Sequence, residues 1–438
     1  MTISRERREQ IIGALRRGTV PDSSLDVLAV GLERFEAALD GELAAVERGN
    51  GAFKAVRGEY GSGKTFFARW LQERAKKRGF ATAEVQISET ETPLHRLETV
   101  YRRLNERLST PETPQGALRS IVDGWFYTLE QDVASGGSSG DDSQIAARTE
   151  ALMEKRLESV TRTTPALTAA LRGYHRALQM GDTPTADGLI AWIAGQPNVA
   201  ASVKRAAGLK GDIDHFGALS FLQGLLVILR DSGYKGLLLV LDEVETLQRV
   251  RGDVREKSLN ALRQLLDEID GGRFQGLYLV ITGTAPFFDG PQGVQRLPPL
   301  AQRLHVDFAT EARFDNPRAV QIRLPAFTAE RLREVGAKVR DLFAEGCGAE
   351  ARIRTMIDDR YVADLAEAVA GKFGGKVGIV PRVFLKKLVA DVLDRVDQFP
   401  EFDPRAHYTL TVSDNELTAV ERAASAGTGI DDIKLEDA

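Results

Sequence analysis

The sequence contains a single cysteine and no long apolar run. With Cys347 alone among 438 residues, the chain can form neither an internal disulfide framework nor a zinc site built from paired cysteines. A lone cysteine is usually a small buried residue. The basic amino-terminal stretch lacks the apolar core of a secretory signal, and the apolar runs are too short to cross a bilayer. We therefore expect a cytoplasmic protein without a membrane segment.

An excess of positive charge is also missing. The formal net charge is −5, with 43% hydrophobic and 28% charged residues. This composition is typical of a folded globular protein and argues against a wholly basic surface for nucleic acid. Two local basic segments, residues 5–17 and 74–79, still leave contact with DNA open. Solvated helix faces are the simpler explanation for both segments.

A glycine-rich turn lies between a strand-like segment and a helical one, in "VRGEYGSGKTFFARWL" at residues 56–71. Gly58, Gly63, Lys64 and Thr65 fit the pattern G-x-x-x-x-G-K-[ST]. Residues 52–58 are apolar and predict a strand, and residues 64–79 have apolar positions at four-residue spacing, which predicts a helix. A strand, a tight loop and a helix start form the context that this motif requires.

The motif predicts a site for ATP and Mg²⁺ rather than an ordinary turn. Backbone N–H groups would surround the phosphates, Lys64 would reach the outer phosphates, and Thr65 would hold Mg²⁺. The start of the helix also attracts anions. No guanine-reading N-K-x-D motif follows, which favours ATP over GTP. The predicted nucleotide-binding residues of this loop are Gly58, Glu59, Tyr60, Gly61, Ser62, Gly63, Lys64, Thr65 and Phe66.

A buried strand with an acidic end is predicted at residues 236–245, "GLLLVLDEVE". Asp242 would hold Mg²⁺ directly or through water, and Glu243 would orient and deprotonate the attacking water. An acidic pair after a strand usually only begins a loop. Together with the phosphate loop upstream, however, the pair predicts ATP hydrolysis.

A further strand is predicted at residues 276–284, and it ends in Thr282 and Thr284. Either hydroxyl could contact the outer phosphate or the attacking water. A capping threonine in a strand-to-loop turn explains the pattern as well. The residues alone do not choose between the two threonines.

The order of elements predicts an α/β fold, with a three-layer αβα core around a parallel sheet. Before the first strand comes a segment of the kind that often packs on the nucleotide base. Residues 134–142 are expected to form a flexible loop within a helical insertion, and residues 425–438 a disordered tail. We divide the chain into amino-terminal helices with the first part of the core (1–109), a mostly helical insertion (110–220), the second part of the core (221–328), a helical lid (329–397), and a carboxyl-terminal extension (398–438).

These motifs together resemble the AAA+ ATPases, in the branch that contains the origin-recognition and initiator ATPases. More narrowly, "ALRRGTVPDSSLDVLAVG", "GEYGSGKTFFARWL", "LLLVLDEVETLQR", "LYLVITGTAPFFDG" and "IRLPAFT" resemble the ATP-binding proteins of bacterial BREX phage-defence systems, of the BrxD type. The likeness covers residues 14–397. It implies a homo-oligomeric ATPase that acts with a large helicase.

The resemblance also implies roles for individual residues. Thr284 or Thr282 would be a sensor of the outer phosphate, and Arg382 would be a lid-borne sensor. Arg303 would act as an arginine finger on the nucleotide of a neighbouring subunit, with Arg296 as the alternative. About 40 residues follow the lid, too few for the winged-helix DNA-binding domain that initiators carry. Contact with DNA, if made, must use another surface.

Three functions remain open from the sequence. The first is an ATPase that works as a nucleotide-dependent switch or loader in phage defence. The second is a scaffold whose assembly needs ATP and whose hydrolysis is incidental. The third is a small-molecule kinase, which the glutamate beside Asp242 and the helices after the last strand disfavour.

Overall fold

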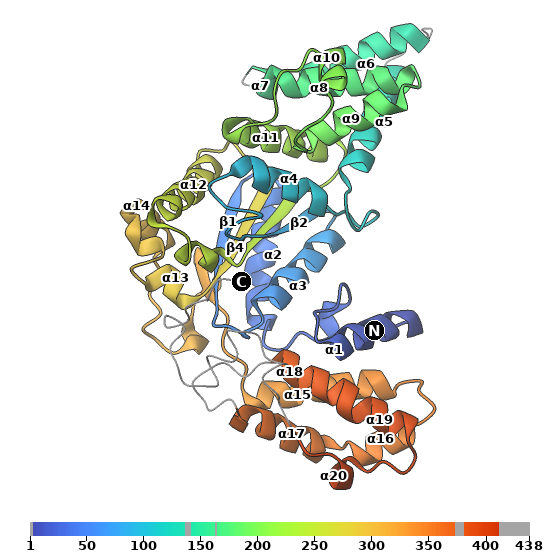
Figure 1. Cartoon of the computed structure of the whole chain (residues 1–438), viewed down its shortest axis with the longest axis vertical. Helices are drawn as coiled ribbons and strands as arrows, with labels where there is room; N and C mark the ends of the chain where they lie inside the picture. Colours follow the sequence, from blue (N-terminus) through green and yellow to red (C-terminus); the bar gives the residue numbers. More distant parts are fainter. Residues whose placement is uncertain (1–2, 136–141, 163, 373–380, 411–438) are drawn as a thin grey trace.

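The computed structural model describes residues 3–135, 142–162, 164–372 and 381–410. Figure 1 shows an elongated molecule with a central sheet, a helical part at one end and a second helical part at the other. The predicted tail and most of the loop predicted at residues 134–142 lie outside the described residues.

The central sheet has five parallel strands in the order β2-β3-β4-β1-β5. Their bounds are Ala52–Arg57 (β1), Ala81–Gln86 (β2), Leu237–Asp242 (β3), Leu277–Gly283 (β4) and Gln321–Arg323 (β5). All residues of β3 and β4 are buried, as their almost uninterrupted apolar sequences require. The structure thus confirms the α/β fold with a parallel sheet.

Helices cover both faces of the sheet. Leu238 and Val240 point to the face covered by α2 (Glu33–Glu47) and α3 (Lys64–Lys77). Leu239 and Leu241 alternate to the other face, where α4 (Leu97–Arg107), α11 (His215–Asp231) and α12 (Gly252–Asp270) pack. The sheet and its two helical layers form the three-layer core, whose helices Figure 1 shows around the strands.

The stretch between β2 and β3 is helical, in keeping with the predicted insertion. Trp125 donates a hydrogen bond to Asp231 over 2.7 Å, and Arg156 forms an ion pair with the same carboxylate at 2.9 Å. These contacts fasten the inserted helices to α11 and so to the core. The inserted helices are α5 (Leu118–Ser135), α6 (Asp142–Arg156), α7 (Glu158–Thr161), α8 (Pro165–Gln179), α9 (Thr183–Ile193) and α10 (Ala201–Ala206).

The carboxyl-terminal helices form a bundle with an apolar core of its own. Helix α1 (Arg5–Arg17) belongs to this bundle, because Ile11, Ile12 and Leu15 are buried in that core. Arg16 also pairs with Asp394 through two hydrogen bonds of 2.6 and 2.7 Å. The two amino-terminal helices are therefore divided between the bundle (α1) and the sheet (α2). The bundle contains α15 (Ala329–Ala344), α16 (Glu350–Met356), α17 (Asp359–Lys372), α18 (Pro381–Lys386), a π-helical turn (Lys387–Leu393), α19 (Asp394–Gln398) and α20 (Pro404–His407).

Two elements are shorter than their sequence patterns suggest. The apolar pattern of residues 319–328 predicts a strand, but β5 covers only Gln321–Arg323 and ends two residues before Pro325. Proline has no N–H group to continue a ladder of hydrogen bonds. The leucines of residues 93–108 fall on one face and predict a helix there, but α4 begins at Leu97, because Pro93 and Arg96 form a turn instead.

Candidate nucleotide-binding site

The predicted phosphate loop connects β1 to α3, as the motif requires. Gly61 and Gly63 have φ angles of 76° and 89°, in the left-handed region that favours glycine. A Cβ atom at Gly58 would lie 2.3 Å from Ser62 Oγ, which is itself buried without a hydrogen-bond partner. The loop is therefore closed tightly around its own backbone and fits a ligand that accepts hydrogen bonds.

Lys64 is the first residue of α3, and its ammonium group lies inside the loop. Its Nζ atom donates to the carbonyl oxygens of Gly58 (2.9 Å) and Glu59 (3.3 Å). Nζ also lies 3.7 Å from a carboxylate oxygen of Glu245 and 5.0 Å from the centre of the Tyr60 ring. The ammonium group that would reach the phosphates is thus held by carbonyl oxygens of the loop itself.

The two predicted magnesium ligands lie side by side. Thr65 Oγ1 donates to Asp242 Oδ2 over 3.2 Å, although the two residues are far apart in the sequence. The carboxyl ends of parallel strands meet at one edge of a sheet, and this places the tip of β3 beside the start of α3. A hydroxyl and a carboxylate are the oxygen ligands that Mg²⁺ prefers, so these residues fit that ion.

Glu243 follows Asp242 in a left-handed conformation, with φ of 58°. Its backbone N–H group donates to Asp242 Oδ1 (3.1 Å) and to Thr282 Oγ1 (3.2 Å). Its carboxylate accepts a hydrogen bond of 2.8 Å from Gln86 Nε2, at the end of β2. Gln86 belongs to no motif in the sequence, and only the register of β2 and β3, which pairs Gln86 with Asp242, could have revealed its contact with Glu243.

Glu245 is a second residue of the site that was not predicted from the sequence. It lies in the short helical turn η2 (Val244–Gln248) and is 4% exposed. Burial raises the pKa of Glu245 to about 6, although the charge of Lys64 acts in the opposite direction. One of its oxygens, Oε2, is buried without a hydrogen-bond partner. Its position two residues after Glu243 was the available signal.

The two candidate sensor threonines occupy different surroundings. Thr282, within β4, is fully buried and donates to Asp242 Oδ1. Thr284 is also buried and begins the short helix α13 (Ala285–Asp289), but its side chain makes no capping hydrogen bond. The structure therefore brings Thr282, rather than Thr284, into direct contact with the predicted metal ligands.

A cavity of about 510 Å³ opens beside the loop, between the core, the amino-terminal segment and the bundle. One end is polar and includes Lys64, Thr65, Asp242 and Glu243. From the bundle, Arg382 of α18 lines the same cavity. The apolar walls suit a nucleotide base, and α1 and α18 lie next to each other in Figure 1. The apolar lining residues are Leu15, Val20, Pro21, Leu28, Val30, Leu32, Phe66, Leu324, Phe327, Val335, Pro381 and Leu385.

A family model described as "BREX system ATP-binding protein BrxC/D" matches residues 3–412. The chain belongs to this family. The match spans nearly the whole sequence and confirms the resemblance to BREX ATP-binding proteins of the BrxD type. No curated protein matches the chain. Within the described parts of this BREX protein, every helix is too short or too polar to span a membrane.

The two candidate finger arginines of the BREX protein lie away from its own cavity. Arg303, in α14 (Pro298–Leu304), pairs with two carboxylates of α12, Asp267 at 2.6 Å and Asp270 at 3.2 Å. Arg296 ends the turn η3 (Val294–Arg296) and is exposed. Neither residue lines the nucleotide cavity. Neither is therefore placed to contact a nucleotide in this cavity.

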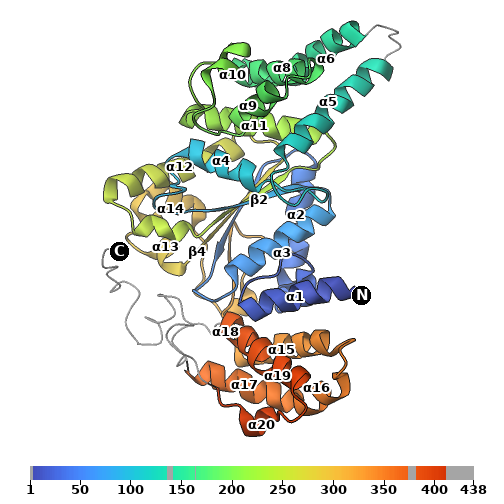
Figure 2. The same cartoon turned by 45° about the vertical axis from the view of Figure 1, so that its right-hand side comes forward.

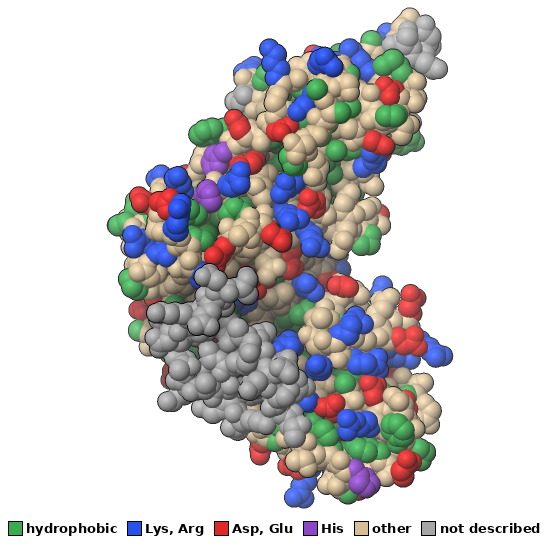
Figure 3. Space-filling model, viewed as in Figure 1, with side chains coloured by type: hydrophobic (Ala, Val, Ile, Leu, Met, Phe, Trp, Pro, Cys, Tyr) green, Lys and Arg blue, Asp and Glu red, His purple; other side chains and the backbone are tan. Residues whose placement is uncertain are grey.

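Ion pairs engage many of the cations in the two basic segments. In α1, Arg5 pairs with Glu9 and Arg16 with Asp394. In α3, Arg74 pairs with Asp40 and Lys77 with Asp26. Figure 3 shows basic and acidic side chains interspersed over one face of the BREX protein. These pairings favour solvated, neutralised helix faces over a surface for DNA.

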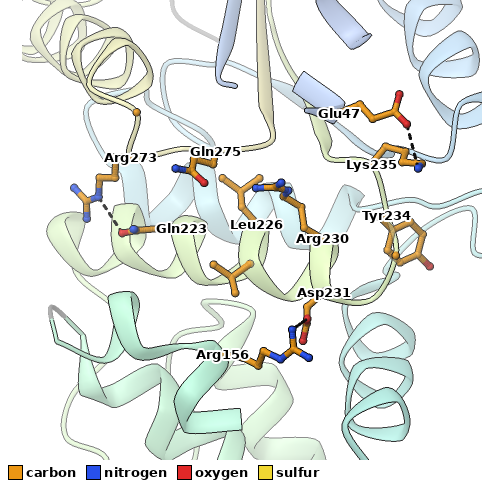
Figure 4. A pocket seen from close by; sticks show the side chains of 13 residues that line it. Glu47, Arg156, Gln223, Leu226, Arg230, Asp231, Tyr234, Lys235, Arg273 and Gln275 are labelled. Carbon is orange, nitrogen blue, oxygen red and sulfur yellow. Dashed lines mark hydrogen bonds and ion pairs between the residues drawn. The ribbon is translucent and has the colours of Figure 1, made fainter. Parts of the chain in front are cut away.

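A second cavity, of about 670 Å³, lies at the opposite edge of the sheet (Figure 4). Helices α2 and α11 end there, next to the start of β3, and helix ends of this kind carry partial negative charge. Its carboxylates are already paired, Asp231 with Arg156 and Glu47 with Lys235. The cations there neutralise helix ends and carboxylates, so this cavity is poorly suited to phosphates.

Proposed function

We propose that this BREX-family protein binds ATP with Mg²⁺ in the cavity beside the loop and hydrolyses it. The observation that supports the proposal best is the meeting of Thr65, Asp242 and Glu243 at the open end of the phosphate loop. A metal-binding pair next to a glutamate is the arrangement that phosphoryl transfer to water needs.

Each residue of the site then has a distinct role. Thr65 and Asp242 would hold Mg²⁺, which neutralises phosphate charge when bound. Lys64 would leave the carbonyl oxygens that hold it and bind the outer phosphates. Glu243 would take a proton from the attacking water. Thr282 would connect the phosphate end of the site to Asp242, while Thr284 stays the less direct candidate for a sensor.

The contact of Gln86 with Glu243 indicates a resting state of the site, in which the glutamate is held away from water. Its amide donates to the carboxylate of Glu243, which stabilises the ionised carboxylate and turns it toward β2. A general base that is held by a neutral donor is less available to water. We therefore propose that activation includes the loss of this hydrogen bond.

The lining of the cavity supports the proposal that the protein is a nucleotide-dependent switch. The bundle contributes Arg382 and Leu385, the amino-terminal segment contributes Val20 and Leu28, and the core contributes the phosphate loop. A nucleotide that touches all three would fix their relative positions, and its release would free them. Such a switch could regulate or load a DNA-acting partner, which in a BREX system we propose to be a helicase.

We further propose that hydrolysis depends on assembly of several copies. Arg303 or Arg296 would reach the nucleotide of a neighbouring subunit and stabilise charge in the transition state. An arginine supplied by the neighbour makes isolated subunits slow. The alternative is a scaffold in which ATP supports assembly and hydrolysis is incidental.

Replacement of Glu243 by glutamine tests the proposal. The variant keeps the shape of the side chain but loses the base, so we expect turnover to fall at least about 100-fold while ATP still binds. Phosphate release and calorimetry measure the two properties. Glu256→Gln, at an exposed position of α12, is the matched control. Full phage resistance from cells carrying Glu243→Gln would favour the scaffold instead.

A further inference from the structure

We propose that Glu245 is a positioning residue that competes with bound phosphates for Lys64 and thereby weakens nucleotide binding. The inference rests on the proposed function, because it assumes that phosphates enter the loop. It adds a residue that the phosphate-loop and acidic-pair motifs do not include.

The Glu245 carboxylate lies beside the Lys64 ammonium group. Glu245 and Lys64 are both buried, and the carboxylate oxygen lies 3.7 Å from Nζ. Both residues line the nucleotide cavity. A buried ammonium needs a nearby negative charge, and without nucleotide Glu245 supplies it.

The Glu245 carboxylate cannot readily move away from this position. It is carried by η2, whose residues Val244 and Leu247 are buried in the core below. Thr246 Oγ1 also donates to the carbonyl oxygen of Glu243 over 2.9 Å, which closes the turn. The backbone on both sides of Glu245 is therefore fixed.

Binding of phosphates would separate the two side chains. Lys64 would turn from Glu245 to the phosphates, and the buried carboxylate would lose the one ion pair that it makes among the described residues. Lys64 lies beside Oε1, and Oε2 has no hydrogen-bond partner, so the described surroundings provide no hydrogen bond to Oε2 that would offset the loss of Lys64. The negative charge of the ligand adds repulsion. Both effects oppose binding, and a neutral side chain of the same shape would remove them.

Binding of MgADP gives the direct test, because ADP is not consumed. Glutamine preserves the volume of Glu245 and removes its charge. We expect Glu245→Gln to bind MgADP about tenfold more tightly than the parent protein in calorimetry. Glu256→Gln should bind like the parent. Unchanged or weaker binding by Glu245→Gln would overturn the inference.

Thermal unfolding of the nucleotide-free protein tests the Lys64–Glu245 contact without any ligand. Lys64→Met leaves Glu245 buried without a counter-charge, so the melting temperature should fall, and adding Glu245→Gln should restore part of the loss. Additive effects of the two substitutions would mean that the side chains are not coupled, and the inference would fail. If the parent protein bound no MgADP, the proposed function would fail. The melting temperatures of the two single variants and the double variant would still show whether Lys64 and Glu245 interact.

Discussion

Gln86 offers a test of how the site is held at rest. Its hydrogen bond to Glu243 is made to a charged group, and such bonds contribute about 1.5–3 kcal/mol. We expect Gln86→Ala to raise the basal ATP turnover of the isolated protein several-fold, because Glu243 becomes free to reach water. A coupled assay of ADP release at saturating ATP measures the change.

The control for this variant is Gln10→Ala, since Gln10 is an exposed glutamine of α1. The Gln10→Ala variant should turn over ATP at the rate of the parent protein. A fall in turnover for Gln86→Ala would show that the amide orients Glu243 for the reaction instead of restraining it.

Glu245 gives the protein a pH-dependent stability. Burial raises the pKa of this carboxyl from 4.5 to about 6, so the folded state holds its proton more tightly than the unfolded chain does. Protonation of Glu245 therefore stabilises the folded state. This contribution to the free energy of unfolding is complete below pH 4.5 and is lost as the pH rises through 6. A shift of this size corresponds to about 2 kcal/mol.

Denaturant unfolding at several pH values measures this contribution. Between pH 5 and 7.5 the free energy of unfolding of Glu245→Gln should improve relative to that of the parent, because the variant has no charge to bury. A difference between the two proteins that stays constant over this range would contradict the assignment.

The residues of the site were predictable to different degrees. Lys64, Thr65, Asp242 and Glu243 belong to motifs with fixed spacing, and the structure brings all four together. Gln86 was not predictable, because its contact with Glu243 depends on the register of two strands whose residues are widely separated in the chain.

Helix α1 carries the element-scale prediction. Ile11 is 1% exposed in the apolar core of the carboxyl-terminal bundle, and replacing a buried isoleucine by alanine costs about 2–5 kcal/mol. We expect Ile11→Ala to speed amide hydrogen exchange in α15 and α18 and to leave α2 unchanged. Exchange monitored by mass spectrometry distinguishes these helices.

Arg5→Ala is the control in the same helix, because the Arg5 side chain is 85% exposed and pairs only with Glu9 among the described residues. Exchange in the bundle should not respond to it. Faster exchange in α2 after Ile11→Ala would mean that α1 supports the core rather than the bundle.

Elements were predicted more reliably than their packing partners. The periodic apolar residues of α1 indicate that one face is buried, but periodicity cannot say whether that face meets the sheet or the bundle. The contact between α1 and Asp394 joins the two ends of the chain and leaves no local signal. The buried strands β3 and β4, in contrast, were evident from their continuous apolar runs.

The whole molecule places its two helical additions at opposite ends of the core. Figure 2 shows the insertion at one end of the sheet and the bundle at the other. Of these two additions, only the bundle contributes described residues to the lining of the nucleotide cavity, together with the amino-terminal segment and the phosphate loop of the core. A change in bound nucleotide can therefore act on the bundle directly, whereas an effect on the insertion must pass through the core.

Dependence of hydrolysis on assembly is the prediction at this scale. The ion pairs of Arg303 with Asp267 and Asp270 are partly exposed, and exposed pairs contribute only about 0–1 kcal/mol each. Arg303 could therefore exchange them for a neighbour's phosphate at little cost. We expect the ATPase rate per subunit to rise with protein concentration and Arg303→Ala to abolish that rise.

Arg296→Ala distinguishes the two arginines. Like Arg303, Arg296 follows β4 in the sequence, but it is exposed and forms none of the ion pairs found among the described residues. The ATPase rate of the Arg296→Ala variant should depend on protein concentration as the rate of the parent does. Loss of that dependence in Arg296→Ala alone would transfer the finger role to Arg296. A rate per subunit that is constant over all concentrations in the parent protein, with and without DNA, would mean that each subunit completes its own site, and the scaffold would then be the better account.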